Sequence, residues 1–286
     1  MTNTSKGLVI TSIGVLIMSL ESLFIKLSTI SPITFSFYLG IFMFFSTALT
    51  FFLKEKDTLK EITKVSFPIL LLAGTLAGSS NIFFISAIKT TTVANVVIIF
   101  GTSAIFSAIF SYFFYKEKIG KNILYASFFM FIGLFIIFND SLGLGNLEGN
   151  IYALLCTITF SLVFVLLARY KKISRIAVTA MTGLFLSLMT FFMLDSIAIN
   201  FYNLIIVACM GLLITPLSRV MLGNGTKFIS ASEVSLLMII ETIMAPIWVW
   251  MFLKEIPSSN TFIGGSIILL TLIINSLYNL RKKEIK

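Results

Sequence analysis

Ten stretches of about 20 mostly apolar residues run through this chain and limit it to one class of structure. Inside a bilayer only helices and closed barrels satisfy their backbone polar groups, and a helix of that length spans the hydrocarbon core. The chain is 58% hydrophobic and 12% charged, whereas soluble domains carry about 25% charged residues. We therefore predict an all-α polytopic membrane protein with ten transmembrane helices. The predicted spans are 7–27, 33–53, 66–87, 91–114, 120–139, 149–169, 176–196, 202–224, 233–253 and 260–280.

Lysine and arginine are distributed unevenly among the loops. With the N-terminus in the cytoplasm, 17 of the 21 basic residues fall in cytoplasmic segments, Lys26, Lys89 and Lys254 fall outside, and Arg219 lies within a span. Cytoplasmic loops are enriched in these residues, so both termini are predicted to be cytoplasmic. The net charge of +9 is thereby explained without a nucleic-acid partner. The abundance of Lys, Ile, Asn and Phe is typical of AT-rich bacterial genomes, so we expect a bacterial protein. Its apolar spans place it in the cytoplasmic membrane, where we expect the lipid bilayer as its partner and no obligate protein partner.

The second half of the chain repeats the first at an offset of 138 residues, and no gap is needed in the aligned region. The pair Lys116–Glu117 aligns with Lys254–Glu255. Each half contains five spans, an odd number, so the second half should enter the membrane upside down. We predict two inverted five-helix repeats, residues 7–139 and 149–280, an architecture that supports alternating access to a site near the middle of the membrane.

Several segments resemble the EamA branch of the drug/metabolite transporter superfamily. They are ESLFIK in the first span, SAIKTTTVANVVIIFGTSAIFSAIFSYFFYKEKIG in the first half and GTKFISASEVSLLMIIETIMAPIWVWMFLKEIPSSNTFIGG in the second. Glu241 and Glu255 take the positions of two characteristic glutamates, whereas Thr242 and Ala104 stand where the family usually has proline. The resemblance implies the same fold and the transport of small metabolites, such as amino acids, nucleosides, purines, choline or S-adenosylmethionine.

Three charged residues lie within the predicted spans away from their ends: Glu21, Arg219 and Glu241. A charge at the centre of a membrane helix costs about 2.5–3.5 kcal/mol, so each needs a partner, water or a function. Glu241 either binds a cationic or zwitterionic substrate or a proton, or forms a structural hydrogen bond. Glu21 binds substrate or pairs with a base such as Lys26 or Lys89. Arg219 extends to the membrane surface, or points inward to pair with Glu241 or to hold a substrate carboxylate.

Small and helix-breaking residues occupy equivalent places in the third and eighth spans. Gly78 aligns with Pro216, and Ser80 lies two residues further on. Paired interruptions of this kind point to a transporter's binding site, although tight helix packing explains them equally well. We therefore predict that Ser80, Asn81 and Asn95 contribute to the substrate site.

The only two tryptophans, Trp248 and Trp250, lie near the predicted outer end of the ninth span. The usual role of such residues is to anchor a helix at the membrane interface. Trp248 follows Glu241 by seven residues and shares its helix face, so it could instead form a wall of the substrate cavity. We include it among the candidate substrate-binding residues.

Motifs of catalysis are missing from the sequence. It contains no histidine, no HExxH and no Walker A motif, so no metal, cofactor, ATP-driven step or enzymatic activity is predicted. We predict a secondary transporter, driven by a proton, ion or substrate gradient, for a small polar metabolite such as an amino acid or another amine-bearing compound. The alternative is a transporter or flippase for a lipid-linked, nucleoside or S-adenosylmethionine-type compound, but Arg219 alone would supply an intramembrane base for phosphate.

Overall fold

The computed structural model describes residues 3–54, 67–116, 121–144, 147–170, 173–194, 196–225, 228 and 231–284, and every regular element in them is a helix. In chain order the elements are α1 (Asn3–Met18), α2 (Glu21–Leu27), α3 (Pro32–Lys54), α5 (Phe67–Thr90), α6 (Val93–Gly101), α7 (Ser103–Tyr115), α8 (Lys121–Leu144), α9 (Leu147–Arg169), α10 (Arg175–Phe191), α11 (Phe201–Cys209), the π-helical segment η2 (Met210–Ile214), α12 (Thr215–Gly225), α13 (Ala231–Leu253) and α14 (Ser259–Glu284).

Each predicted span coincides with one helix or with a run of consecutive helices. α1 and α2 together form the first, α6 and α7 the fourth, and α11, η2 and α12 the eighth. In the described part of the chain, seven of these units are long and apolar enough to cross a membrane. Three more are apolar over 10–17 residues: Arg175–Phe191, Leu237–Leu253 and Ser259–Asn275. The fold is that of an all-α polytopic membrane protein.

The seventh span is shorter than predicted. α10 ends at Phe191, whereas the apolar pattern extended the span over 176–196. Beyond it, the side chain of Ser196 accepts a hydrogen bond from the backbone of Ala198, and Asn200 caps the N-terminus of α11. Such local bonds between side chains and backbone compete with another helical turn, which hydropathy alone does not register.

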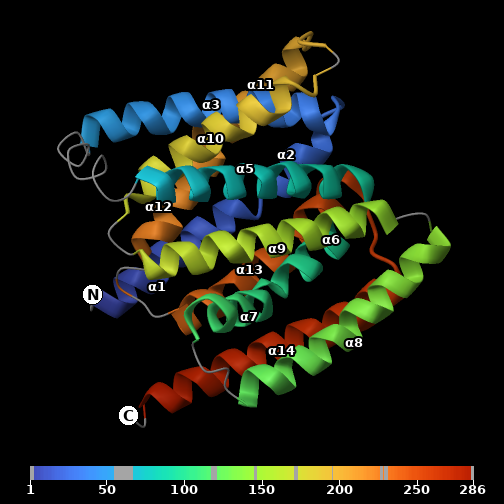
Figure 1. Ribbon diagram of the computed structural model, residues 1–286. Coiled ribbons are helices and arrows are strands. Elements are labelled where there is room, and N and C mark those ends of the chain that lie inside the picture. The colour runs from blue at the N-terminus through green and yellow to red at the C-terminus, as the bar shows by residue number, and fades with distance from the viewer. Residues whose placement is uncertain are drawn as a thin grey trace.

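Figure 1 shows the helices arranged as a layered bundle, with α3, α10 and α5 on one side and α8 beside α14 at the opposite edge. α10 packs against α3 and α5, α5 against α9, and α1 against α12. α13 contacts α1, α2, α6 and α14 and so lies in the interior. The first turn of α1 and the last turn of α14 lie at the same end of the bundle.

Glycines allow two helix pairs to approach very closely. On α3 and α10, a Cβ at Gly40 would lie 2.7 Å from the carbonyl oxygen of Gly183, and one at Gly183 would lie 2.8 Å from that of Gly40. On α8 and α14, Gly133 and Gly264 face each other in the same way, at 2.7 and 2.6 Å. In lipid, helices do not associate through the hydrophobic effect. Small residues at such crossings allow close van der Waals packing, which holds the helices together instead.

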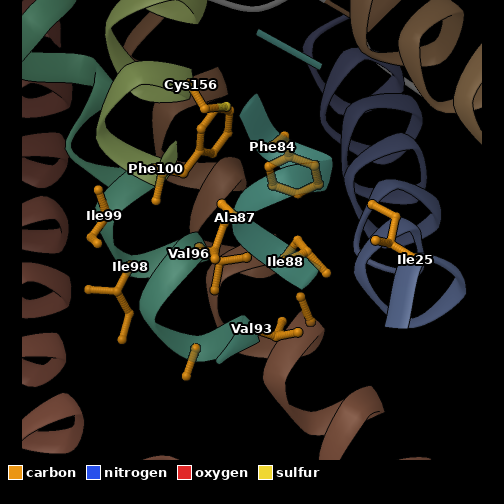
Figure 2. Close-up of a cluster of buried hydrophobic side chains, with 14 of the residues drawn as sticks. Ile25, Phe84, Ala87, Ile88, Val93, Val96, Ile98, Ile99, Phe100 and Cys156 are labelled. Atoms are coloured by element: carbon orange, nitrogen blue, oxygen red, sulfur yellow. The ribbon is translucent and has the colours of Figure 1, made fainter. Parts of the chain in front are cut away.

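The largest apolar core takes side chains from most of the helices, and Figure 2 shows the part of it that α2, α5, α6 and α9 contribute. In this view Ile88 of α5 and Val96 of α6 lie near one another, and Phe100 of α6 lies beside Cys156 of α9. All eight residues from Val93 to Phe100 are buried, as expected for a helix surrounded by others.

The periphery of the bundle is also apolar. Large exposed hydrophobic side chains cover the outer surfaces of α8 and α14, among them Leu124, Tyr125, Phe128, Phe135, Phe262 and Ile274. A surface of this kind suits a lipid environment, whereas soluble monomers rarely expose large contiguous apolar patches. The functional polar residues must therefore be sought in the interior.

Candidate functional site

Helix geometry is interrupted between α1 and α2. The backbone N–H of Leu20 bonds to the carbonyl oxygen of Ile17, three residues back, at 3.1 Å. The carbonyl of Leu16, which it would meet in a regular helix, instead accepts a hydrogen bond from the hydroxyl of Ser19 at 2.6 Å. The tight turn makes α2 a separate helical segment, and Glu21 is its first residue.

A second irregularity divides the eighth span. Pro216 has no N–H to donate to the carbonyl of Leu212, four residues earlier. That carbonyl accepts a bond from the Ser46 hydroxyl of α3 at 2.8 Å. Just before the proline, the N–H of Thr215 bonds five residues back to Met210, which closes a π-helical turn. Membrane helices tolerate proline when a neighbouring helix satisfies the freed group in this way.

A third irregularity separates α6 from α7 at Thr102. The Thr102 hydroxyl donates to the backbone carbonyl of Ile99 at 2.6 Å. The Ser161 hydroxyl of α9 donates to the backbone carbonyl of Ser103 at 3.0 Å. This break lies next to α13, because a Cβ on Gly101 would be 3.7 Å from the hydroxyl of Thr242. Interrupted helices of this type surround the substrate site in many transporters.

The predicted interruption in the third span is not present. α5 is a continuous helix through Gly78 and Ser80. A Cβ on Gly78 would lie 3.1 Å from the backbone nitrogen of Leu186, so the glycine serves close packing of α5 against α10. The prediction of paired interruptions is therefore wrong for the first half, because a glycine, unlike proline, keeps its N–H and does not force a break.

Glu21 and Arg219 form an ion pair in the interior. The guanidinium Nη2 of Arg219 lies 3.5 Å from Oε2 of Glu21, and their side chains are 25% and 3% exposed. The hydroxyl of Ser218 lies 3.4 Å from Oε1 of the same carboxylate. Of the alternatives raised by the sequence, Glu21 thus pairs with neither Lys26 nor Lys89, and Arg219 points inward rather than to the membrane surface.

Glu241 is the second carboxylate of this region. It lies on α13, is buried, and interacts electrostatically with both Glu21 and Arg219. None of the residues described in the structure donates a hydrogen bond to its carboxylate. Burial of an ionised carboxylate that accepts no hydrogen bond is costly. We refer to Glu21, Arg219 and Glu241 as the central charge cluster.

Trp248 connects α13 to the break between α1 and α2. Its indole nitrogen donates a hydrogen bond to the Ser19 hydroxyl at 3.0 Å, and its ring packs on the buried core. Trp250, by contrast, is 52% exposed. Only Trp250 therefore lies where an interfacial anchor is expected, while Trp248 lies near the central charge cluster.

Ser80 also lies near the central charge cluster. Its hydroxyl contacts the carbonyl oxygen and the sulfur of Cys156 on α9, at 3.2 and 3.4 Å. Cys156 in turn lies within electrostatic range of Arg219 and Glu241. The hydroxyl of Thr215 on α12 is buried and close enough to interact with the carboxylate of Glu21. These small polar groups line the same interior region.

The two asparagines lie elsewhere. The amide of Asn81 bonds to the carbonyl of Ala77 within α5 at 2.8 Å. Asn95, in the first turn of α6, bonds to Asn150 at 3.3 Å and accepts a short hydrogen bond from Thr261. Asn95 thus belongs to a polar cluster between the N-terminal turns of α6, α9 and α14, which sequence reasoning did not foresee because its members come from distant segments.

A further ion pair joins Lys26 to Glu255. The ammonium of Lys26 lies 2.9 Å from Oε2 of Glu255 and donates to the carbonyl of Thr91, also at 2.9 Å. Oε1 of Glu255 accepts the N–H of Val93 at 2.7 Å and so caps α6. Sequence analysis did not anticipate this contact, because the two residues come from opposite halves of the chain. The described residues contain no group of three metal-ligating side chains.

Comparison with known proteins gives consistent results. The chain matches the sequence pattern of the EamA-like transporter family twice, over residues 5–139 and 147–277. It is 26% identical over 240 residues to an uncharacterized transporter of Clostridium kluyveri, covering 76% of this chain and 74% of that protein. It is 31% identical over 176 residues to the uncharacterized transporter YdfC of Bacillus subtilis, covering 57% of this chain and 56% of that protein.

A solved crystal structure has a similar fold. It superposes with a TM-score of 0.66 over 96% of this chain and 98% of the other, at 17% sequence identity. At that identity the likeness concerns the fold alone.

Proposed function

This chain belongs to the EamA-like transporter family of the drug/metabolite transporter superfamily, and we propose that it is a secondary transporter for an amino acid or a similar amine-bearing metabolite in the bacterial cytoplasmic membrane. In this proposal it works by alternating access between two inverted repeats, with both termini in the cytoplasm. The observation that carries the proposal is the buried carboxylate of Glu241, which accepts no hydrogen bond from the residues that the structure describes and lies near an ion pair that already occupies Glu21.

The charges of the cluster favour a cationic group. Arg219 compensates one carboxylate, Glu21, and leaves one negative charge on Glu241. An ammonium group placed beside Glu241 would compensate that charge in a region where water does not. The side chain of Arg219 keeps a quarter of its surface exposed, so it can also meet the carboxylate of a zwitterionic substrate.

A proton compensates the same charge. Glu241 then binds either the ammonium group of the substrate or a proton. A carrier that releases substrate on one side of the membrane and changes back to the opposite-facing state with a proton bound couples substrate movement to the proton gradient. The occupant chosen in each half of the cycle follows from the relative concentrations on the two sides of the membrane.

The contacts between helices support two equivalent halves. At the repeat offset, the first span corresponds to the sixth, and the third span corresponds to the eighth. The first span packs on the eighth through α1 and α12, and the sixth packs on the third through α9 and α5, so equivalent pairs of spans make the same contact. The second and seventh spans, α3 and α10, pack on each other, and so do the fifth and tenth, α8 and α14. This pattern is expected for repeats related by a pseudo-two-fold axis.

Helix ends support the same equivalence. Lys116 and Lys254, which align in the sequence, end α7 and α13 in the left-handed conformation with φ of 56° and 58°. Their N–H groups bond four residues back, to Tyr112 at 2.9 Å and Trp250 at 3.0 Å. The ammonium group of Lys116 lies 5.9 Å from the ring centroid of Tyr112, and that of Lys254 lies 5.9 Å from the ring centroid of Trp250. Glu117, the counterpart of Glu255, lies outside the described residues.

The orientation of the last span in each half supports inversion. The side chain of Asn122 donates to that of Asn275 at 2.8 Å, while Gly133 faces Gly264. Positions that advance along α8 thus meet positions that recede along α14, so the two helices are antiparallel. Repeats of the same orientation in the membrane would place these equivalent helices parallel.

The decisive experiment compares Glu241→Gln with the native protein in proteoliposomes. Substrates are first selected by thermal stabilisation of the purified protein across amino acids, choline, nucleosides and S-adenosylmethionine. Loss of a charge-assisted contact of about 1.5–3 kcal/mol should reduce uptake of the selected amine roughly 10- to 100-fold. Glu148→Gln, at the exposed start of α9, is the matched control and should transport normally. Normal uptake by Glu241→Gln would refute the role of Glu241.

The alternative of a flippase for phosphate-bearing lipids has weaker support. Such a substrate needs an available cation in the membrane interior, and the guanidinium of Arg219 is engaged by Glu21. Stabilisation by a lipid-linked phosphate, and by no amine, in the same screen would favour this alternative.

A further inference from the structure

The ion pair between Lys26 and Glu255 lies at the end of the bundle opposite the termini, and it connects segments from both halves of the chain. Lys26 ends α2, while Glu255 lies in the connection between α13 and α14. The same two side chains hold the junction of α5 and α6, through the carbonyl of Thr91 and the N–H of Val93. One pair of charged residues thus joins three regions of the protein.

The pair is more than a surface contact. Its side chains are 19% and 21% exposed, and each makes a further hydrogen bond to the backbone. Beneath it, Thr261 of α14 bonds to Asn95 of α6, and Asn95 bonds to Asn150 of α9. If the two halves separate at this end, these polar contacts must break and the charged groups must find water.

The short helix α2 connects this ion pair to the central charge cluster. Glu21 is its first residue and Lys26 lies in its last turn, which places them about 7.5 Å apart along the helix axis at 1.5 Å per residue. The turn at Ser19 and Leu20 separates α2 from α1. α2 can therefore change its orientation without moving the whole of α1.

We propose that the Lys26–Glu255 ion pair is the outer gate of this transporter, and that α2 couples its opening to occupancy of the central charge cluster. The proposal rests on the proposed function for its direction of opening. In the closed state the ion pair holds α2 against the α5–α6 junction and the α13–α14 connection. When a ligand rearranges the pair between Glu21 and Arg219, α2 shifts, Lys26 leaves Glu255, and the outer end opens.

Thiol accessibility tests the gate without knowledge of the substrate. Ser22 is 1% exposed and lies on α2 between the cluster and the gate. In a protein with Cys156 and Cys209 replaced by alanine, Ser22→Cys is exposed to a membrane-impermeant thiol reagent outside intact cells. Glu255→Gln should accelerate labelling about tenfold, because the ion pair is lost. The glutamine can still accept the N–H of Val93, so the cap of α6 is kept.

Two further variants make the test specific. Lys26→Gln should accelerate labelling to the same extent, and the reversed pair Lys26→Glu with Glu255→Lys should slow it again. The control is Lys254→Gln, which removes an adjacent positive charge that stacks on Trp250 and does not contact α2. It should label at the native rate.

The gate is refuted if Glu255→Gln and Lys26→Gln elute as folded monodisperse protein and label at the native rate. It is also refuted if Lys254→Gln accelerates labelling as much as they do, because the effect would then be one of general charge. Labelling requires no substrate, so a failure of the gate is distinguishable from normal transport by Glu241→Gln, which would refute the substrate site alone.

Discussion

The carboxylates of Glu21 and Glu241 lie on helices that contact each other, α2 and α13, yet their environments differ. Glu21 has a guanidinium at 3.5 Å and a hydroxyl at 3.4 Å, whereas no residue in the described part of the chain donates a hydrogen bond to Glu241. A buried ion pair is seldom a net source of stability, but its members cannot be removed singly without cost. In the proposed mechanism Glu241 is therefore the carboxylate that receives the ligand's positive charge, and Glu21 and Arg219 stay paired until the ligand rearranges them.

Removal of Arg219 should therefore destabilise the protein, and removal of both partners should restore it in part. Arg219→Met leaves Glu21 buried without its base, at a cost of roughly 2 kcal/mol after allowance for the partial exposure of the arginine. The double variant Glu21→Gln/Arg219→Met has no uncompensated charge and should unfold at a higher temperature in detergent than Arg219→Met.

The matched control for this comparison is Arg169→Met, at the end of α9, where the guanidinium stacks over the ring of Tyr115 at 5.5 Å. It should leave the melting temperature nearly unchanged. A double variant no more stable than Arg219→Met would mean that the loss comes from packing of the arginine stem and not from the unpaired carboxylate.

At the scale of elements, the irregular helices define the site. The breaks at Ser19–Leu20 and Thr102 and the π-helical turn before Thr215 all adjoin the central charge cluster. At Ser19 the hydroxyl binds the Leu16 carbonyl that the backbone leaves, and at Pro216 the hydroxyl of Ser46 on α3 binds the carbonyl of Leu212. At Thr102 the hydroxyl and the backbone N–H both bond to the carbonyl of Ile99. At these breaks, hydroxyl groups thus form hydrogen bonds with backbone carbonyl oxygens, as a helix interruption inside a membrane requires.

The hydrogen bond from Ser46 should matter only while residue 216 is proline. In the native protein, Ser46→Ala should cost about 0.6 kcal/mol, the average for hydrogen bonds between membrane helices, measured by reversible unfolding in detergent. In Pro216→Ala the new N–H can bond to Leu212 itself, so the same Ser46→Ala change should cost almost nothing.

Ser127→Ala on α8 controls for the loss of a hydroxyl, because Ser127 bonds only to Ile123 of its own helix, at 2.8 Å. It should have the same small effect in both backgrounds. Equal costs of Ser46→Ala with and without Pro216 would show that Ser46 does not compensate for the proline.

At the scale of the whole molecule, the proposed inversion places equivalent residues on opposite sides of the membrane. Lys116 and Lys254 have the same backbone conformation, and each lies over an aromatic ring four residues earlier, that of Tyr112 or Trp250. Both are at helix ends and exposed, which makes them a matched pair for a measurement of topology.

In a background with Cys156 and Cys209 replaced by alanine, Lys254→Cys should react with an impermeant thiol reagent in intact cells. Lys116→Cys should react only after the membrane is permeabilised, because the positive-inside distribution places it in the cytoplasm. Reaction of both from the same side would exclude inverted repeats.

Hydropathy, charge distribution and repetition were sufficient to predict the helical class, and the apolar stretches match the helices closely. They did so because a bilayer demands long apolar helices whatever their partners are. The helix ends were less predictable: α10 stops at Phe191 because local side-chain bonds compete with the helix, which average hydropathy does not describe.

Glu21, Arg219 and Glu241 could be identified from the sequence as ionisable residues within predicted spans. Their partners could not: the pairing of Glu21 with Arg219, the bond from Trp248 to Ser19 and the separate cluster around Asn95 become visible only in the folded chain. The physical reason is that burial and hydropathy are properties of a segment, whereas pairing depends on the rotation and separation of helices far apart in the chain. Those are fixed by close contacts such as Gly40 with Gly183, which no single segment contains.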